Sequence, residues 1–475
     1  MTTNSLLQGL NASTRTTNGM RANASTFSKN VDLFFDIGAS RGKDLSGAFA
    51  QAMAEDANVA VRILQWSRDV RGGAGERQVF RTILKNLAKN DKTRAVASAL
   101  LPKVPEIGRW DDLLELMDTP LEADAAYFIG EALVNKNGLA AKWMPRKGEV
   151  AVKLRRYWAL SPKQYRKLLV TLTNVVETKM CAKEWDTIEF DKLPSLASAR
   201  YQKAFGRNAE SAYAVYKAGL EKGTTTINAG AVYPYDVLKS VVRGDEVVAN
   251  AQWKALPDYL QGSTENLITV ADVSGSMNCP VGDNPNLTCM DVCISLAMYI
   301  SERSRGAFKD AFITFARAPR LQYLTGKTLG DRYRQLQRAD WDTNTDMVAV
   351  FDQILQTAQT RRVPEAEMPT TVLVLSDMQF DAATKDYHRD RNNFDGTAVE
   401  EIRARYEAAG YKMPKLVFWN LNANPKTAPA TVNDVGVALV SGCSPSLLKS
   451  ILGGKDFSPE SMMLETVMVP RYDWQ

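Results

Sequence analysis

The chain has 475 residues, of which 45% are hydrophobic and 24% charged, with a formal net charge of +5. This length is enough for two or three domains, and the composition is that of an ordinary globular protein. No apolar run is long enough for a membrane span, and the first twenty residues lack the basic and apolar segments of a secretory signal, so we expect no membrane partner.

Charge is distributed unevenly along the chain. Residues 1–262 contain 37 Lys and Arg against 28 Asp and Glu, a net charge of +9, whereas residues 263–475 contain 22 against 26, a net charge of −4. Such asymmetry indicates different partners for the two parts, with a polyanion for the basic part.

Cysteine and histidine content excludes several kinds of site. The five cysteines are scattered and odd in number, which favours reduced thiols in a cytoplasmic setting over a disulfide framework. Cys279, Cys289 and Cys293 lack a fourth zinc ligand at the usual spacing. The only histidine, His388, lies in the polar stretch KDYHRDRNN, so sites that need two histidines are excluded.

The first 30 residues are rich in Ser, Thr and Asn and are expected to form a flexible arm. From about residue 44 to 260, within an expected helical domain of residues 31–262, the chain shows helical periodicity, as in LSGAFAQAMAED, NVAVRILQWSRD, ERQVFRTILKNLAKN, TRAVASALLPKV and WDDLLELMD. Short links such as RDVRGGAGER separate these segments. Successive amphipathic helices with short links predict stacked helix pairs, a HEAT-like α-helical repeat domain.

The densest basic segment is 136–167, which has ten Lys or Arg, one acid, and the aromatic residues Trp143, Tyr157, Trp158 and Tyr165. Cationic side chains can contact phosphates, and aromatic rings can stack on bases. This combination predicts binding of single-stranded nucleic acid. The alternative is a solvated helix face whose aromatic residues point inward. The candidate nucleic-acid contacts are Lys142, Arg146, Lys147, Lys153, Arg155, Arg156, Lys163, Arg166 and Lys167, together with Arg71 and Arg77 of the glycine-rich link.

From residue 263 onward, strands and helices are expected to alternate. NLITVADVS, DAFITFA, TTVLVLSD, KLVFWNLN and VGVALVSG read as buried strands, with TCMDVCISLAMYISERS, DMVAVFDQILQTAQ, GTAVEEIRARYEAAG and SPSLLKSILGG as helices. This alternation predicts a doubly wound α/β domain over 263–475, of mostly parallel strands. In such a sheet, ligands bind at the carboxyl ends of the strands.

Side chains with oxygen atoms occur after two of these strands and before one of these helices. Asp272 ends the first strand and is followed by Ser274 and Ser276, Thr343 precedes a helix in WDTNTDM, and Asp377 ends the strand of VLVLSD. Hydroxyl and carboxylate oxygens are the ligands that Mg²⁺ prefers. We therefore expect a site for Mg²⁺ or another divalent cation. The alternative is that the serines only cap the following turn.

This spaced D-x-S-x-S, with the later threonine and aspartate, resembles the metal-ion-dependent adhesion site of von Willebrand factor A domains, which have a Rossmann-like fold. The resemblance implies a metal that takes a carboxylate from a partner protein and performs no chemistry. The chain departs from the family pattern at Trp341 and Asp342, where a glycine is usual.

The two-part layout resembles the Ro autoantigen, or TROVE-module, proteins, in which helical repeats bind noncoding RNA. RDVRGGAGER, LPKVPEIGRWDDLL, AAKWMPRKG, LPSLASARYQKAF and LSDMQFD resemble more closely an uncharacterised family of viruses, phages, plants and fungi. The expectation is a non-enzymatic RNA-binding scaffold whose metal site engages a protein partner, in a host cytoplasm or a virion. The alternatives are an assembly module that does not bind RNA and, less favoured by this hydroxyl-rich site, a metal-dependent nuclease.

Overall fold

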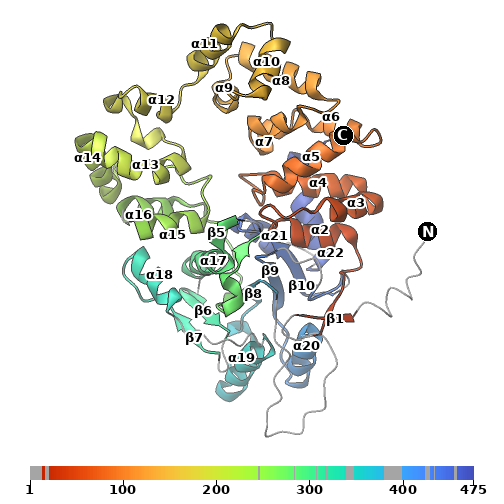
Figure 1. Ribbon diagram of the computed structural model, residues 1–475. Coiled ribbons are helices and arrows are strands. Elements are labelled where there is room, and N and C mark those ends of the chain that lie inside the picture. The colour runs from red at the N-terminus through yellow and green to blue at the C-terminus, as the bar shows by residue number, and fades with distance from the viewer. Residues whose placement is uncertain are drawn as a thin grey trace.

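The structure is a computed structural model that describes residues 13–16, 21–243, 246–282, 284–305, 308–315, 319–338, 347–378, 398–422, 428–432, 434–453 and 457–474. Both predicted parts of the chain are present, a helical half and an α/β half (Figure 1). Across these residues, every helix is too short or too polar to cross a lipid bilayer.

The helical half consists of short helices joined by tight links. Its elements are α2 (Lys29–Ile37), α3 (Ser46–Glu55), α4 (Ala57–Arg68), α5 (Gln78–Lys89), α6 (Arg94–Leu100), α7 (Val104–Ile107), η1 (Trp110–Leu116), α8 (Glu122–Val134), α9 (Gly138–Trp143), α10 (Glu149–Tyr157), α11 (Pro162–Leu172), α12 (Val176–Cys181), η2 (Trp185–Thr187), η3 (Phe190–Lys192), α13 (Ser195–Asn208), α14 (Glu210–Lys222), α15 (Pro234–Arg243) and α16 (Glu246–Ala255).

Local sequence explains where these helices begin. At α11, Ser161 is the N-cap: its Oγ accepts from the Gln164 backbone N–H at 3.3 Å, and Gln164 Oε1 accepts from the Ser161 N–H at 2.9 Å. This reciprocal capping satisfies two backbone N–H donors. Pro162, at the first helical position, has no backbone N–H that would need a partner.

One predicted helix has a different form. WDDLLELMD was expected to be an amphipathic α-helix, but Trp110–Leu116 is a 3₁₀ helix. In this segment the buried carboxylate of Asp112 accepts from Arg68 Nε of α4 at 2.8 Å and from Arg81 Nε of α5 at 2.6 Å, so contacts with distant residues act on it besides the local helical pattern.

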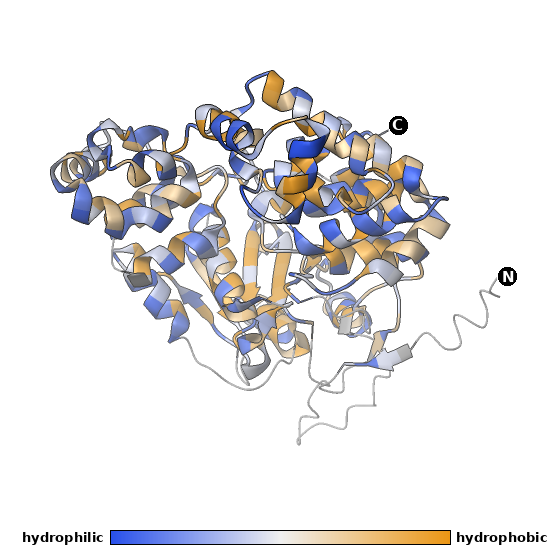
Figure 2. Cartoon of the chain, turned by 45° about the horizontal axis from the view of Figure 1, so that its top comes forward, coloured by the Kyte–Doolittle hydropathy of each residue, from blue (hydrophilic) through white to orange (hydrophobic). Residues whose placement is uncertain are grey.

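The α/β half is built on a six-stranded sheet. Its strands are β3 (Leu267–Ala271), β6 (Ala311–Thr314), β7 (Leu321–Tyr323), β8 (Thr371–Ser376), β9 (Lys415–Asn420) and β10 (Val437–Ser441). Their order is β10-β9-β8-β3-β6-β7, and all neighbours are parallel except β6 and β7. This is the doubly wound order, which reverses direction between β3 and β8. The parallel strands of the sheet are buried and apolar, and they lie at the centre of the fold (Figure 2).

The remaining elements surround the sheet. They are η4 (Gly275–Asn278), β4 (Pro280–Val281), β5 (Asn284–Thr288), α17 (Cys289–Arg303), α18 (Leu329–Gln337), α19 (Met347–Arg361), η6 (Glu365–Glu367), α20 (Ala398–Ala408), η7 (Pro445–Leu447), α21 (Leu448–Gly453), α22 (Pro459–Val467) and η8 (Pro470–Tyr472). Sequence periodicity did not identify β7, the β4–β5 hairpin, α18 or α22. These elements are short or lie mostly on the surface, where the apolar pattern is weak.

Part of the predicted N-terminal arm is held against the α/β half. β1 (Ser13–Arg15) and β2 (Arg21–Asn23) form an antiparallel pair, and Asn23 exchanges two backbone hydrogen bonds with Ala428. The last two residues of the expected arm, 29 and 30, already belong to α2.

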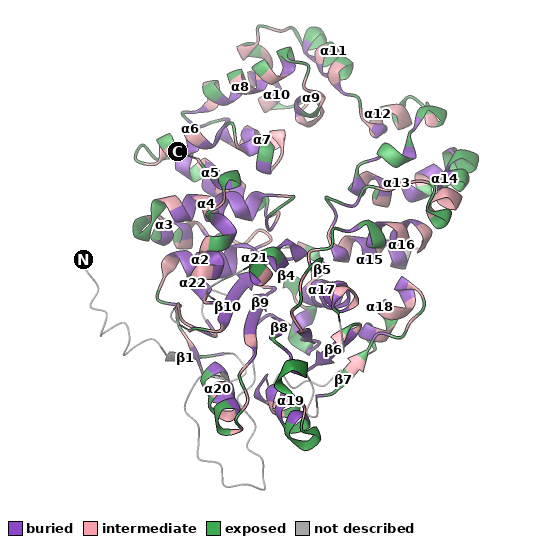
Figure 3. Cartoon of the chain, turned by 180° about the vertical axis from the view of Figure 1, so that it is seen from behind, coloured by how far each residue is buried: buried purple, intermediate pink, exposed green. Residues whose placement is uncertain are grey.

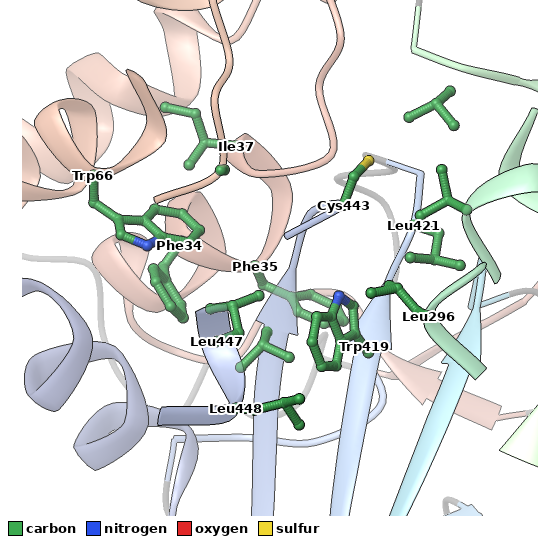
Figure 4. Packing of buried hydrophobic residues seen from close by; sticks show 14 of the residues in the cluster. Phe34, Phe35, Ile37, Trp66, Leu296, Trp419, Leu421, Cys443, Leu447 and Leu448 are labelled. Atoms are coloured by element: carbon green, nitrogen blue, oxygen red, sulfur yellow. The ribbon is translucent and has the colours of Figure 1, made fainter. Parts of the chain in front are cut away.

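The two halves share a large hydrophobic core, and buried residues between 176 and 248 form a second, smaller one within the helical half. In the shared core, Phe35 of α2 lies beside Trp419 of β9, and Phe34 packs on Trp66 at a ring-centroid distance of 4.6 Å (Figure 4). Leu447 and Leu448, which follow β10, belong to the same cluster. At its other end, the helical half packs α15 against α17 and α18. The chain path therefore leaves the α/β half at α2 and returns to it at α15 and α16, forming a ring (Figure 1).

The turn of RDVRGGAGER packs where the two ends of this ring meet. Tyr233, directly before α15, donates its hydroxyl to the Ala74 carbonyl at 3.2 Å. A Cβ on Gly73 would lie 1.9 Å from the Trp66 carbonyl oxygen, and Gly75 has a φ of +73° with Tyr233 Oη 2.1 Å from the Cβ position. The glycines thus permit a tight turn and close backbone contact, which only this residue type allows.

Candidate functional site

The first candidate site lies at the switch point of the sheet. The chain continues from β3 to β6 on one side of the sheet order and from β8 to β9 on the other, and in doubly wound sheets ligands bind at the carboxyl ends of two such adjacent strands. Their register pairs Ala271 with Leu375, which places Asp272 beside Ser376 and Asp377. The Asp272 backbone N–H donates to the Leu375 carbonyl at 3.0 Å, so the last ladder bond fixes this aspartate.

Hydroxyl groups surround the buried carboxyl of Asp272. Its Oδ1 accepts from the Ser274 backbone N–H at 3.0 Å, and its Oδ2 accepts from Ser376 Oγ at 2.6 Å. Ser274 Oγ and Ser276 Oγ are 3.0 Å apart, and Ser276 is exposed. The predicted Asp272, Ser274 and Ser276 therefore form one compact group with an opening to solvent.

Electrostatics at this group favour a cation. Burial and the negative charge of Asp377 raise the pKa of Asp272 to about 6, against the hydrogen bonds from Ser376 and Ser274 that lower it. A cation beside two neighbouring buried carboxyls offsets their repulsion. The donor set of carboxylate and hydroxyl oxygens suits Mg²⁺, so the residues present fit a hard divalent ion. Thr343, the fifth predicted ligand, lies outside the described residues, as does His388.

The second candidate site is a set of cations on α10, on α11 and on the link before α10. Lys163, Arg166 and Lys167 are exposed at helical spacing, so they lie on one face of α11, opposite the buried Tyr165 and Leu169. The ribbon of α11 is accordingly exposed in part and buried in part (Figure 3). We define the α10–α11 cationic face as Lys147, Arg155, Arg156, Lys163, Arg166 and Lys167. In the part of the chain that the structure describes, none of these six forms an ion pair.

The other predicted nucleic-acid contacts have protein partners or lie elsewhere. Lys153 pairs with Asp118 and Glu122, and Lys142 lies 3.6 Å from Glu177. Arg146 donates to Thr173 Oγ1 at 3.2 Å, and Arg71 donates to the Glu106 carbonyl at 3.2 Å. Arg77 is exposed directly before α5. The four residues with protein partners are less available to a polyanion than the α10–α11 cationic face, whereas Arg77 is exposed at a different place in the helical half.

Two aromatic residues of the basic segment pack against each other and against neighbouring backbone. Trp158 donates its indole N–H to the Ala126 carbonyl at 2.9 Å and stacks on Tyr165 at a ring-centroid distance of 5.8 Å. Tyr165 is buried and donates to the Pro145 carbonyl at 2.9 Å. The alternative of an inward-pointing ring is therefore confirmed for Tyr165, while Trp158 is half-buried and packs against Tyr165 and α8.

Sequence reasoning missed Ser376 at the first site and the position of Arg109 next to the basic segment. Ser376 donates to Asp272 but precedes the predicted Asp377 by one residue, and only the pairing of β3 with β8 indicates its role. Arg109 lies over the Trp143 ring at 4.6 Å and is half-buried. Burial and, after it, the positive charge of Arg77 lower the pKa of Arg109.

Comparisons with known proteins agree with a two-part chain. Residues 126–265 match a domain of unknown function, DUF2828, and residues 266–470 match another, DUF7788. The crystal structure of the Ro (RSR) protein of Deinococcus radiodurans is similar with a TM-score of 0.48 and 17% identity, over 93% of this chain and 100% of that one. The uncharacterized protein L728 of Acanthamoeba polyphaga mimivirus is 30% identical over 510 residues, which cover 95% of this chain and 86% of the relative. The chain therefore belongs to the family of this mimivirus protein.

Proposed function

We propose that this protein is a non-enzymatic, Ro-like RNA-binding scaffold. In this proposal, the helical half is a HEAT-like repeat domain that contacts single-stranded or structured RNA. The α/β half is a von Willebrand factor A-like domain whose metal-ion-dependent adhesion site engages a carboxylate of a partner protein.

The α10–α11 cationic face carries the RNA part of the proposal. Exposed cations without acidic partners attract a polyanion, whereas cations that are already paired add little attraction. The distribution of charge along the chain supports the same assignment, because the helical half has a net charge of +9 over residues 1–262.

RNA binding is tested by filter binding of a single-stranded oligouridylate at rising salt. The variant Lys163→Gln, Arg166→Gln, Lys167→Gln should weaken binding at least about tenfold and reduce the magnitude of the log–log salt slope by about 2, at roughly 0.7 per lost phosphate contact on a single strand. These side chains are exposed, so folding should be unchanged.

The matched control removes the same charges from another surface of the helical half. Lys203, Arg207 and Lys222 lie on α13 and α14 and are exposed. Their triple glutamine variant should bind RNA nearly as the wild type does. An equal loss of RNA affinity in both variants would show that only the overall charge matters. If the wild type binds no RNA at low salt, an RNA function is refuted.

A second candidate function is a protein-assembly module that uses the metal site without RNA, as a phage accessory or virion component. The grouping of Asp272, Ser274 and Ser276 at the sheet edge favours it. When bound, Mg²⁺ supplies an electrophilic position for a partner carboxylate, and Asp272, Ser274, Ser276, Thr343 and Asp377 would hold it. Under this function a purified partner is released by EDTA, while removal of RNA has no effect.

Metal binding is tested by thermal unfolding with and without Mg²⁺. At a Mg²⁺ concentration about 100 times its Kd, wild-type protein should gain about 2.7 kcal/mol. The Ser274→Ala, Ser276→Ala variant should lose this gain. Ser444→Ala, Ser446→Ala is the control, since these hydroxyls also lie side by side, 2.8 Å apart, in the turn after β10. Its metal response should equal that of the wild type.

A further inference from the structure

Two thiols lie next to each other beside the candidate metal site. Cys279 Sγ and Cys289 Sγ are 3.5 Å apart. The cysteines flank the β4–β5 hairpin, and the Cys289 backbone N–H donates to the Cys279 carbonyl at 3.1 Å. The next pair along the hairpin, Pro280 and Thr288, is also in register. The backbone of the hairpin, and not one side-chain rotamer alone, therefore holds the two sulfurs opposite each other.

The two cysteines differ in access and in rigidity. Cys289 is buried and is the first residue of α17, whose N-cap is Thr288. Cys279 is half-buried and follows η4, the 3₁₀ turn that carries Ser276. An oxidant from solvent would therefore meet Cys279 first, with Cys289 placed behind it to complete a bond.

Cys279 is also joined to its surroundings by two hydrogen bonds. Its backbone N–H donates to the Ser276 carbonyl at 3.0 Å, and its sulfur accepts from Asn422 Nδ2 at 3.4 Å. Asn422 Oδ1 in turn accepts from Lys43 Nζ of the helical half at 3.0 Å. A displacement of Cys279 is thus transmitted both to the turn of the metal site and to the contact between the halves.

We propose that Cys279 and Cys289 are a reversible oxidation site, at which a peroxide converts the two thiols to a disulfide and thereby weakens divalent-cation binding at the neighbouring Ser276 turn. The coupling to the cation rests on the proposed metal site, whereas disulfide formation does not.

The chemistry balances in two steps. Cys279 sulfur attacks one oxygen of hydrogen peroxide: the O–O bond breaks, an S–O bond forms, and one water leaves, giving a sulfenic acid. Cys289 sulfur then attacks the Cys279 sulfur, the S–O bond breaks, and the hydroxide leaves as a second water with the Cys289 proton. The two thiols lose two electrons and two protons in total, and the peroxide is reduced to two waters.

The geometric consequence follows from the bond length. A disulfide has an S–S distance of about 2.05 Å, so the two sulfurs must approach each other from 3.5 Å. Since Cys289 is fixed in a buried helix, most of the movement falls on Cys279 and on the turn of Ser276. Disturbing an outer contact of a metal site typically lowers affinity by about tenfold or more.

The experiment uses the full chain with Cys181→Ser, which removes the exposed thiol that could form bonds between molecules. After brief treatment with hydrogen peroxide, mass spectrometry of proteolytic peptides should find Cys279 and Cys289 linked, with the loss of two hydrogen atoms, and dithiothreitol should reverse the link. Calorimetric titration with Mg²⁺ should give a Kd about tenfold weaker for the oxidised than for the reduced protein.

Two further variants separate this site from general oxidation. Cys279→Ser, or Cys279→Ala if the serine variant folds poorly, should abolish both the link and the effect of peroxide on Mg²⁺ binding. Cys443→Ser removes a buried thiol outside the pair and should change neither. Absence of the link, or a link with unchanged Mg²⁺ affinity, would overturn the proposal. If the reduced protein binds no Mg²⁺, the metal site and the coupling fail together, while the peptide masses still decide whether the disulfide forms.

Discussion

Asp112→Ala is expected to lower the free energy of unfolding by about 3–5 kcal/mol, because it leaves a buried charge without its partner. The Asp112 carboxylate accepts from Arg68 Nε at 2.8 Å and from Arg81 Nε at 2.6 Å, in addition to the Arg109 backbone N–H. Arg68 is only 1% exposed, so water does not replace the lost carboxylate. Denaturant unfolding followed by circular dichroism measures this loss as a lower midpoint.

The neighbouring Asp111 is the matched control for this network. It pairs with Arg81 at 2.7 Å but remains partly exposed, so Asp111→Ala should cost about 1 kcal/mol or less. Replacing both buried partners, as in Arg68→Met with Asp112→Leu, should recover much of the stability, since no uncompensated charge remains at that position. Equal losses from Asp111→Ala and Asp112→Ala would show that burial of the pair is not the cause.

Asp69→Ala should cost about 2–4 kcal/mol and loosen the C-terminal segment from α4. Asp69 is buried, and its carboxylate accepts from two nitrogens of Arg471, with Nη2 to Oδ1 at 2.8 Å, and from the Tyr472 hydroxyl at 3.0 Å. The substitution leaves the buried Tyr472 hydroxyl without its acceptor. Limited proteolysis should cleave the segment after residue 468 faster than in the wild type, and thermal unfolding should begin earlier.

The effect of Asp69 should depend on pH. Burial alone would raise the pKa of Asp69, but hydrogen bonds from Arg471 and from the Arg71 backbone, with the charge of Arg471, hold it below its ordinary value of 3.8. Because the pKa of Asp69 is lower in the folded than in the unfolded state, its ionised carboxylate stabilises the fold above pH 3.8. This stabilisation is lost as the pH falls through the folded-state pKa. The wild type and Asp69→Asn should therefore converge in stability in strong acid.

A second acid on the same C-terminal segment is the control for Asp69. Asp473 pairs with Arg62 but is 53% exposed, so Asp473→Asn should change stability by less than about 1 kcal/mol. If Asp473→Asn and Asp69→Asn were equally destabilising, the stabilisation would come from charge on the segment in general and not from the buried clamp.

Several features of this protein are determined by local sequence. Apolar residues at helical spacing predicted α3, α4 and α5, and β-branched apolar runs predicted all the parallel strands of the sheet. An aspartate directly after such a run lies at the sheet edge, so the positions of Asp272 and Asp377 could be inferred without coordinates. These inferences succeed because helix and strand periodicity depends on neighbours within a few residues.

Predictions from local sequence were wrong or incomplete where contacts with residues far away in the chain shape the structure. WDDLLELMD has helical periodicity, yet Asp112 accepts from Arg68, 44 positions earlier, and the segment is a 3₁₀ helix. The ring of Tyr165 occurs among cations, yet packing against Trp158 and the link before α10 turns it inward. Nothing in the spacing of these residues indicates which way they point.

Sequence alone thus determined the two-part layout, the charge asymmetry and the set of oxygens after β3 and β8. Tertiary structure decided that Ser376 supports Asp272, that Asp69 holds Arg471 across 402 positions, and that both ends of the helical half dock on the α/β half. The physical reason is that periodicity is set by short-range backbone geometry, whereas buried charge pairs and core contacts form only between segments that folding brings together.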